Sequence, residues 1–135
     1  MDMKRARVLV IEDEKIMATF VLGGLRRMGI LDLYLNKNGL TALRELDTVR
    51  PDLIITDVHM QSMGGIEFLK NLRSLADGKL SNLPVIFLSA DSSASTVSEA
   101  LTLGIAGYLV KPPNIKVLAT KIEQALKGHT LEFFD

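Results

Sequence analysis

The strongest constraint on the fold of this chain is a fivefold alternation between short apolar runs and longer segments with helical periodicity. The runs are rich in β-branched residues and cover residues 7–11, 31–35, 52–56, 84–88 and 107–110. Their length and composition predict β-strands. The first, third and fourth runs are continuously apolar, which is typical of parallel strands covered on both faces. The second alternates with polar residues and is predicted to lie at a sheet edge.

The segments between these runs carry apolar residues at spacings that predict helices. Asn38 and Ser92 are predicted to be helix N-caps, and Gly29, Gly104 and Gly128 stand where helices need a C-cap. The apolar positions are Ile16, Phe20 and Leu25, then Leu43 and Leu46, then Ile66, Leu69 and Leu72, then Val97, Ala100 and Leu101, and last Leu118, Ile122 and Ala125.

This alternation predicts an α/β fold of the (βα)₅ type, a doubly wound, five-stranded parallel sheet in the flavodoxin-like order 2-1-3-4-5. The 135 residues suit one domain, predicted over residues 1–128 and followed by a short C-terminal tail at 129–135. Ligands of such sheets bind beyond the carboxyl ends of the strands, near the switch point between the first and third strands. The functional residues are expected at that edge.

Composition excludes several classes of function. Sixteen basic residues balance sixteen acidic ones, so we expect no direct binding to nucleic acid or to an anionic membrane. The chain has no cysteine, which excludes disulfides, thiolate metal sites and cysteine nucleophiles. It also has no apolar run long enough to span a bilayer, and its charged opening lacks a signal-peptide core, so we expect a cytoplasmic protein.

Polar side chains stand at the carboxyl ends of four predicted strands. Glu12 and Asp13 follow the first strand, Asp57 the third, Ser89 the fourth and Lys111 the fifth. Neighbouring strands lie about 4.8 Å apart, so Asp57 is expected between Asp13 and Ser89. Lys111 starts two strands away, roughly 10 Å, and its long side chain can cross most of that gap. These residues are predicted to form one site.

The chemistry of this cluster favours Mg²⁺ and phosphate. Three carboxylates packed together repel one another, and a hard divalent cation relieves that repulsion. Mg²⁺ completes its octahedron with water and phosphate oxygens, so the cluster indicates phosphoryl chemistry. Lys111 and Ser89 supply the charge and the hydrogen-bond donor that a phosphoryl group requires, and Asp57 is the candidate nucleophile that forms an acyl phosphate.

Four motifs carry a family resemblance. Residues 10–14, 52–60, 84–90 and 107–112 resemble the receiver domain of bacterial two-component response regulators, in particular the single-domain, chemotaxis-type members. The resemblance extends from residue 7 to about residue 127. Two positions depart from the family pattern, because Gln61 stands where proline is common and Pro113 stands where an aromatic residue is usual.

The resemblance implies that Asp57 accepts a phosphoryl group from a histidine kinase or phosphotransfer protein. It implies that Asp13, Asp57 and the backbone carbonyl of His59 bind Mg²⁺, with Glu12 assisting through water. It further implies that the protein is not an enzyme beyond its own phosphorylation and slow dephosphorylation.

Signal output is also implied by the resemblance. Ser89 and Tyr108 would act as switch residues that change the face made by the fourth helix, fifth strand and fifth helix, and an output protein would read that face. His59 and Asp91 stand two residues beyond Asp57 and Ser89, so they are expected to control water access to the acyl phosphate.

Other functions are weighed against this phospho-switch. A phosphate sink would drain phosphoryl groups from a shared kinase, and a pseudo-receiver scaffold would act without phosphorylation. An aspartate-nucleophile phosphatase needs a second aspartate two residues after the nucleophile, where His59 stands. A flavin carrier needs a Ser/Thr/Gly-rich loop after the first strand, where residues 12–14 are all acidic.

Overall fold

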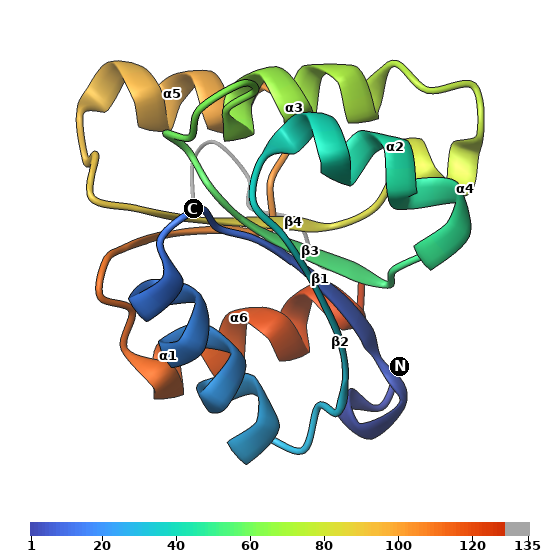
Figure 1. Cartoon of the computed structure of the whole chain (residues 1–135), viewed down its shortest axis with the longest axis vertical. Coiled ribbons are helices and arrows are strands. Elements are labelled where there is room, and N and C mark those ends of the chain that lie inside the picture. Colours follow the sequence, from blue (N-terminus) through green and yellow to red (C-terminus); the bar gives the residue numbers. More distant parts are fainter. Residues whose placement is uncertain (129–135) are drawn as a thin grey trace.

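Five parallel strands form a sheet in the order β2-β1-β3-β4-β5 in the computed structural model, which describes residues 1–128 (Figure 1). The strands are β1 (Arg7–Ile11), β2 (Asp32–Asn36), β3 (Leu53–Asp57), β4 (Val85–Ser89) and β5 (Gly107–Val110). The helices are the short 3₁₀ turn η1 (Met3–Arg5), α1 (Lys15–Arg27), α2 (Gly39–Val49), α3 (Gly65–Arg73), α4 (Gly78–Ser81), α5 (Ala94–Thr102) and α6 (Ile115–Leu126). The predicted doubly wound fold and strand order are confirmed, with the alternating strand β2 at an edge.

The helices cover both faces of the sheet because the strand side chains alternate. Leu9 and Ile11 of β1 belong to a core shared with α2, α3, α4 and α5. Val8 and Val10 point to the opposite face and pack in a second core with α1 and α6. Figure 1 shows these two helix layers on either side of the sheet. Both faces of the central strands are therefore buried, as the continuous apolar runs predict.

Three strand boundaries differ from the prediction. β2, β3 and β4 each begin one residue later and include the polar residue that follows the apolar run. The reason is that main-chain pairing, and not side-chain polarity, bounds a strand: Asn36 pairs with Ile11, and Asp57 pairs with Leu88. The polar side chains of the site are thus held by the sheet itself, which positions them more firmly than a loop would.

Two helix predictions need correction. The N-cap of α5 is Ser93 and not Ser92, and the Ser93 side chain bonds the Thr96 hydroxyl in place of a backbone N–H. The helix α4 was not predicted because its four residues are too few to show a period; Asp77 caps it by accepting from Lys79 N–H at 3.0 Å. No helix among residues 1–128 has the length and apolar character needed to cross a membrane.

The buried face of α1 also differs from the face that the spacing of apolar residues predicts. Ala18, Val21 and Leu25 pack against the sheet, whereas Ile16 is 86% exposed and Phe20 is 38% exposed. Only one stripe of a surface helix can reach the core, and in α1 the small Ala18 occupies part of that stripe. An apolar pair is left on the solvent side of α1.

Candidate functional site

Three carboxylates meet at the carboxyl ends of β1 and β3. Glu12, Asp13 and Asp57 each place an oxygen so that the three atoms lie within 4.8 Å of one another. Glu12 and Asp57 are buried, while Asp13 is exposed. The strand order places β3 beside β1, so Asp57 becomes a neighbour of Asp13 and Glu12, from which it is 44 and 45 positions away in the chain.

Lys111 reaches this cluster from the end of β5. Its Nζ lies 2.6 Å from Glu12 Oε1 and 2.9 Å from Asp57 Oδ2. Glu14 Oε1 stands farther off, at 3.9 Å, and was not among the predicted site residues. The Lys111 side chain is only 8% exposed, so its charge acts in a partly desolvated environment where it is screened less than at the surface.

Burial and ion pairing have opposite effects on the pKa values of this cluster. Burial raises the pKa of the Glu12 carboxyl above its usual value, although the hydrogen bond from Lys111 works against that shift. Burial lowers the pKa of the Lys111 amine, but hydrogen bonds to Glu12 and Asp57 outweigh burial and raise it overall. One ammonium thus faces three carboxylates, and the remaining negative charge favours a divalent cation with oxygen ligands.

Asp57 is held from several directions. Val58 N–H donates to its Oδ1 at 2.7 Å, and Lys111 donates to its Oδ2. The buried Thr56 hydroxyl donates to the Asp57 carbonyl at 2.9 Å. A Cβ on Gly65 would lie 2.2 Å from that same carbonyl oxygen, so α3 begins directly against the end of β3. Sequence reasoning missed Thr56 and Gly65; the only signals for them are their places just before the nucleophile and at the start of the next helix.

Ser89 and Tyr108 lie on the neighbouring strands, as expected. Ser89 is 1% exposed, and its Oγ accepts from Asp91 N–H at 3.0 Å. The Tyr108 ring packs edge-on against Phe87 with centroids 6.0 Å apart, and its hydroxyl donates to the Asp91 carbonyl. Burial raises the pKa of the Tyr108 phenol. Asp91 therefore connects the two predicted switch residues.

A side-chain link also joins the loops after β3 and β4. His59 Nε2 lies 2.7 Å from Asp91 Oδ2, and the His59 side chain is 69% exposed. Asp91 Oδ1 accepts from Ser93 N–H at 2.8 Å, and its Oδ2 accepts from the Thr96 hydroxyl at 3.0 Å. These partners, His59 first, hold the pKa of the Asp91 carboxyl well below its usual value. The two residues predicted at the mouth of the site are in contact with each other.

A doubly wound sheet of this order, with a buried lysine among three carboxylates at its carboxyl edge, defines the receiver class of phosphorylation-dependent signalling domains. The chain belongs to the response regulator receiver domain family, whose model matches residues 8–123. This membership places it among signalling proteins and not among classical enzymes.

Curated relatives and solved structures agree with the family. The chain is 35% identical over 121 residues to Chemotaxis protein CheY-3 of Vibrio cholerae, covering 90% of this chain and 92% of that protein. It is 34% identical over 118 residues to Chemotaxis protein CheY of Pseudomonas aeruginosa, covering 87% and 94% respectively. The structure resembles the receiver domain of the Francisella response regulator 1452, with a TM-score of 0.81, 34% identity and coverage of 92% and 98%. It also resembles chemotaxis response regulator CheY4 of Vibrio cholerae, with a TM-score of 0.77, 29% identity and coverage of 89% and 98%.

Proposed function

We propose that this protein is a phosphorylation-dependent switch whose Asp57 accepts a phosphoryl group from a histidine kinase or phosphotransfer protein. The observation that supports this most is the 2.9 Å contact between Lys111 Nζ and Asp57 Oδ2 inside a cluster of three carboxylates. A merely structural ion pair would not need two further carboxylates beside it, since each adds repulsion and desolvation cost. The complete cluster argues against a pseudo-receiver scaffold.

In the proposed step, an Asp57 carboxylate oxygen attacks the phosphorus of a phosphohistidine on the donor. The phosphorus–nitrogen bond breaks, the imidazole leaves with its electron pair, and an acyl phosphate remains on Asp57. Lys111 then stabilises the phosphoryl oxygens by exchanging its contact with the carboxylate for one with the new anion. Ser89 donates its hydroxyl to a phosphoryl oxygen; in its present bond the Ser89 oxygen accepts from Asp91 N–H, which leaves the O–H available. Water later removes the phosphoryl group slowly by attacking the same phosphorus: the bond from phosphorus to the Asp57 oxygen breaks, the carboxylate is restored and inorganic phosphate is released.

The cluster has the hard oxygen donors that Mg²⁺ prefers, within 4.8 Å of one another. Asp13, Asp57 and the backbone carbonyl of His59 would hold the ion, and Glu12 would assist through water. The bound ion would supply positive charge that offsets the repulsion between the carboxylates and an incoming phosphoryl group. The exposed Asp13 leaves the site open to an ion from solvent.

A phosphohistidine donor needs a surface beside Asp13 on which to dock. α1 starts next to Asp13 and carries Ile16 and Phe20 exposed. A groove of about 380 Å³ beside Asp13 is lined by Ala18 and Leu22 of α1 and by Leu35 of β2, which is 43% exposed. Exposed apolar residues gathered beside a charged site are typical of protein-binding surfaces. We assign this side of the molecule to the phosphoryl donor.

For output, Ser89 and Tyr108 would change the surface formed by α5, β5 and α6 once Asp57 is phosphorylated. Val110 is 51% exposed and Val117 is 43% exposed on β5 and α6, which gives an output protein apolar contacts there. The proposed setting of this exchange is the cytoplasm.

The test is phosphorylation by a small phosphodonor with Mg²⁺, followed by intact mass. The wild-type chain is expected to gain one phosphoryl mass that is lost in base, as acyl phosphates are. Asp57→Asn is expected to abolish the gain because an amide is not a nucleophile of this kind. Asp47→Asn, at an aspartate whose side chain is 91% exposed, is the matched control and should react like the wild type. A gain that persists in Asp57→Asn overturns the assignment of the nucleophile, and a wild-type chain that never gains the mass overturns the phospho-switch.

A further inference from the structure

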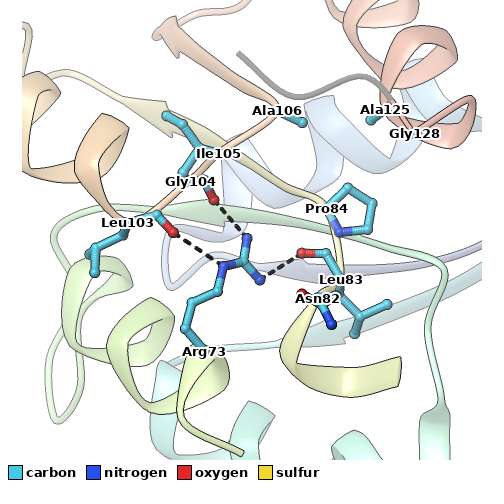
Figure 2. A pocket seen from close by; sticks show the side chains of 10 residues that line it. All are labelled: Arg73, Asn82, Leu83, Pro84, Leu103, Gly104, Ile105, Ala106, Ala125 and Gly128. Atoms are coloured by element: carbon cyan, nitrogen blue, oxygen red, sulfur yellow. Dashed lines mark hydrogen bonds between the residues drawn. The ribbon is translucent and has the colours of Figure 1, made fainter. Parts of the chain in front are cut away.

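Arg73 at the end of α3 braces the end of the molecule opposite the carboxylate cluster (Figure 2). Its guanidinium donates to four main-chain carbonyls, those of Leu103 at 3.3 Å, Gly104 at 2.7 Å, Ser81 at 3.0 Å and Leu83 at 2.8 Å. A guanidinium has five N–H donors, so these bonds occupy nearly all of them. Arg73 therefore has a structural role, and a surface that is free for a partner lies elsewhere, at the outer edge of β2.

β2 leaves one side of its main chain without a partner among the described residues. It is an edge strand and pairs with β1 alone. Glu12 N–H donates to the Asn36 carbonyl at 2.9 Å, so the main-chain groups of Asn36 point toward β1. Because these groups alternate in direction along a strand, the N–H and C=O groups of Leu33 and Leu35 point outward. Such an edge can pair with a strand of another chain.

The outer edge of β2 lacks the features that commonly prevent such pairing. Natural edge strands carry lysine, proline, a bulge or an inward charge. On the α1 side this edge carries only leucines: Leu31 is 75% exposed, Leu35 is 43% exposed, and Leu33 packs partly against the core with α1. The one charged residue within β2 is Asp32, and Arg7 already binds it at 3.0 Å. The edge is thus both unpaired and apolar.

The α2 side of the same edge carries opposite charges next to each other. Arg7 lies over the Tyr34 ring at 5.7 Å, and its Nε contacts Asp32 Oδ2. Its Nη1 donates to the Val49 carbonyl at 2.7 Å, whereas Nη2 makes no hydrogen bond within residues 1–128. The Arg7 and Asp32 side chains are 39% and 43% exposed. This pair of charges can therefore be matched by the same pair on a second copy, turned by a two-fold axis.

We propose that two copies of this chain pair through their β2 strands, antiparallel and centred on Leu33. Leu33 then lies opposite Leu33 of the second copy, and Leu31 of each copy lies opposite Leu35 of the other. Residues opposite each other in an antiparallel pair point to the same face, so the leucines form one apolar strip on the α1 side. The outward main-chain groups of the paired residues bond one another, which extends the sheet from one copy into the next.

This register suits the charges on the α2 side as well. Asp32 lies opposite Tyr34 of the second copy, which brings its carboxylate beside the Arg7 guanidinium that covers that ring. A pair centred on Tyr34 would also join the outward main-chain groups, but it would place Leu31 opposite Lys37. The register centred on Leu33 is favoured because each leucine meets a leucine and each Asp32 meets a cation.

The dimer would limit access to the phosphorylation site. Leu35 lines the groove beside Asp13 together with Ala18 and Leu22, and Leu31 of the second copy would contact its Leu35 end. The phosphoryl donor is assigned to the same groove, so dimer and donor would exclude each other there. This consequence rests on the proposed function, whereas the strand pairing does not. One strand pair forms a small interface, below about 1,200 Å², and such interfaces are weak.

The test is sedimentation of the unphosphorylated full chain over a wide range of concentration. The wild type is expected to change from monomer to dimer as its concentration rises. Leu31→Lys with Leu35→Lys places lysine opposite lysine in both outer pairs and should abolish the dimer. Val110→Lys with Val117→Lys is the matched control, since these valines are exposed to a similar degree, 51% and 43%, away from β2. This control should still form the dimer.

A charge swap separates pairing from a general loss of apolar surface. Leu31→Glu with Leu35→Lys places opposite charges across from each other and should form the dimer that the double lysine variant loses. A wild-type chain that stays monomeric at millimolar concentration overturns the proposal. So does a dimer that the Val110 and Val117 substitutions abolish, because it would form through β5 and α6.

Disulfide cross-linking tests the register, since the chain has no cysteine of its own. Opposite residues in a bonded antiparallel pair have Cα atoms about 5.5 Å apart, within the range of a disulfide. Leu33→Cys should therefore give a covalent dimer on oxidation. Leu35→Cys should react much less, because the two copies of residue 35 lie four positions apart along the strands. Faster cross-linking of Tyr34→Cys than of Leu33→Cys would show that the register is wrong.

Discussion

At the scale of single residues, the proposed function depends on the small number of charged side chains around Asp57 and on their positions. Lys111 bonds Asp57 and Glu12 at once, so neither carboxylate is left without a partner. Asp13 has no such compensation from Lys111 in the structure and is the exposed member of the cluster. It is therefore the carboxylate that gains most from a cation.

Replacing Asp13 tests that role in metal binding. Asp13→Asn keeps the size of the side chain but removes its charge, so we expect the affinity for Mg²⁺ to fall by about tenfold or more, since even indirect partners of a metal are worth about 10–100-fold. Amide NMR during a Mg²⁺ titration measures the change. Wild-type shifts should cluster in the loops after β1 and β3. Shifts that avoid both loops would contradict the metal site, and Asp47→Asn serves as the charge-matched control.

The contact between His59 and Asp91 leads us to expect that the phosphoryl group is lost slowly from Asp57, because this pair restricts the access of water. His59→Ala removes the side chain that contacts Asp91 and is predicted to stand at the mouth of the site, so water should reach the acyl phosphate more easily and shorten its lifetime several-fold. The decay of the phosphorylated mass with time measures this. Lys70→Ala breaks a comparable surface contact, 3.1 Å from Glu99, and should leave the lifetime unchanged. An unaltered lifetime in His59→Ala would show that the pair does not control water.

At the scale of elements, the start of α3 against the end of β3 decides the shape of the site. Gly65 N–H donates to the Val58 carbonyl at 2.8 Å, and the helix backbone approaches the Asp57 carbonyl too closely for any side chain at position 65. This contact fixes the loop that carries His59. The loop is therefore held in place by the packing of the first residue of α3. This contact compensates for the rigidity that a proline at position 61 would supply and that Gln61 lacks.

Gly65→Ala should destabilise the domain. The added Cβ would lie 2.2 Å from a backbone oxygen, which has no flexible end to move, and overpacking of this kind costs about 1–3 kcal/mol. Urea unfolding measures the loss. Gly23→Ala is the matched control, because a Cβ there meets nothing within 4 Å in the interior of α1 and should stabilise the helix by up to about 1 kcal/mol. Equal stability of the two variants would refute the close contact.

At the scale of the whole molecule, a chain of contacts leads from the loop after Asp57 to β5 and the start of α5. Asp91 bonds Ser89 through its N–H and Tyr108 through its carbonyl, and its carboxylate bonds His59. A rearrangement at Ser89 therefore changes the surroundings of Tyr108 and the start of α5 together. A switch needs the phosphoryl group to favour one of two arrangements, typically by about 1–3 kcal/mol.

A phosphate mimic tests this coupling. Beryllofluoride should shift amides throughout residues 90–103 and 107–118, well beyond the groups that touch it. Ser89→Ala should preserve metal binding but reduce those distant shifts, because it removes the hydroxyl that links the phosphoryl group to the backbone. If the shifts stay around Asp13, Asp57 and Lys111, the protein is a phosphate sink and its output role is wrong.

The amino-acid sequence by itself determined the layers of the fold and the edge where the site lies. Apolar periodicity reports which side of a segment is buried, so the strands, their two-sided burial and the edge position of β2 could all be predicted. The common order of doubly wound five-stranded sheets, 2-1-3-4-5, then places the ends of β1 and β3 side by side. Asp13 and Asp57 could be paired for that reason alone, without any knowledge of the side-chain geometry.

The tertiary structure decided the contacts that no period encodes. Lys111 was predicted to start about 10 Å from Asp57 and to cross most of that gap, yet its side chain contacts both Asp57 and Glu12. The link from His59 to Asp91 and the carbonyl cluster around Arg73 join residues from separate loops and helices. Sequence spacing cannot predict such contacts. They depend on the conformations that long, polar side chains adopt when the packing of helices and strands removes them from water. The same packing left Ile16 in solvent, since the single buried stripe of α1 was already filled.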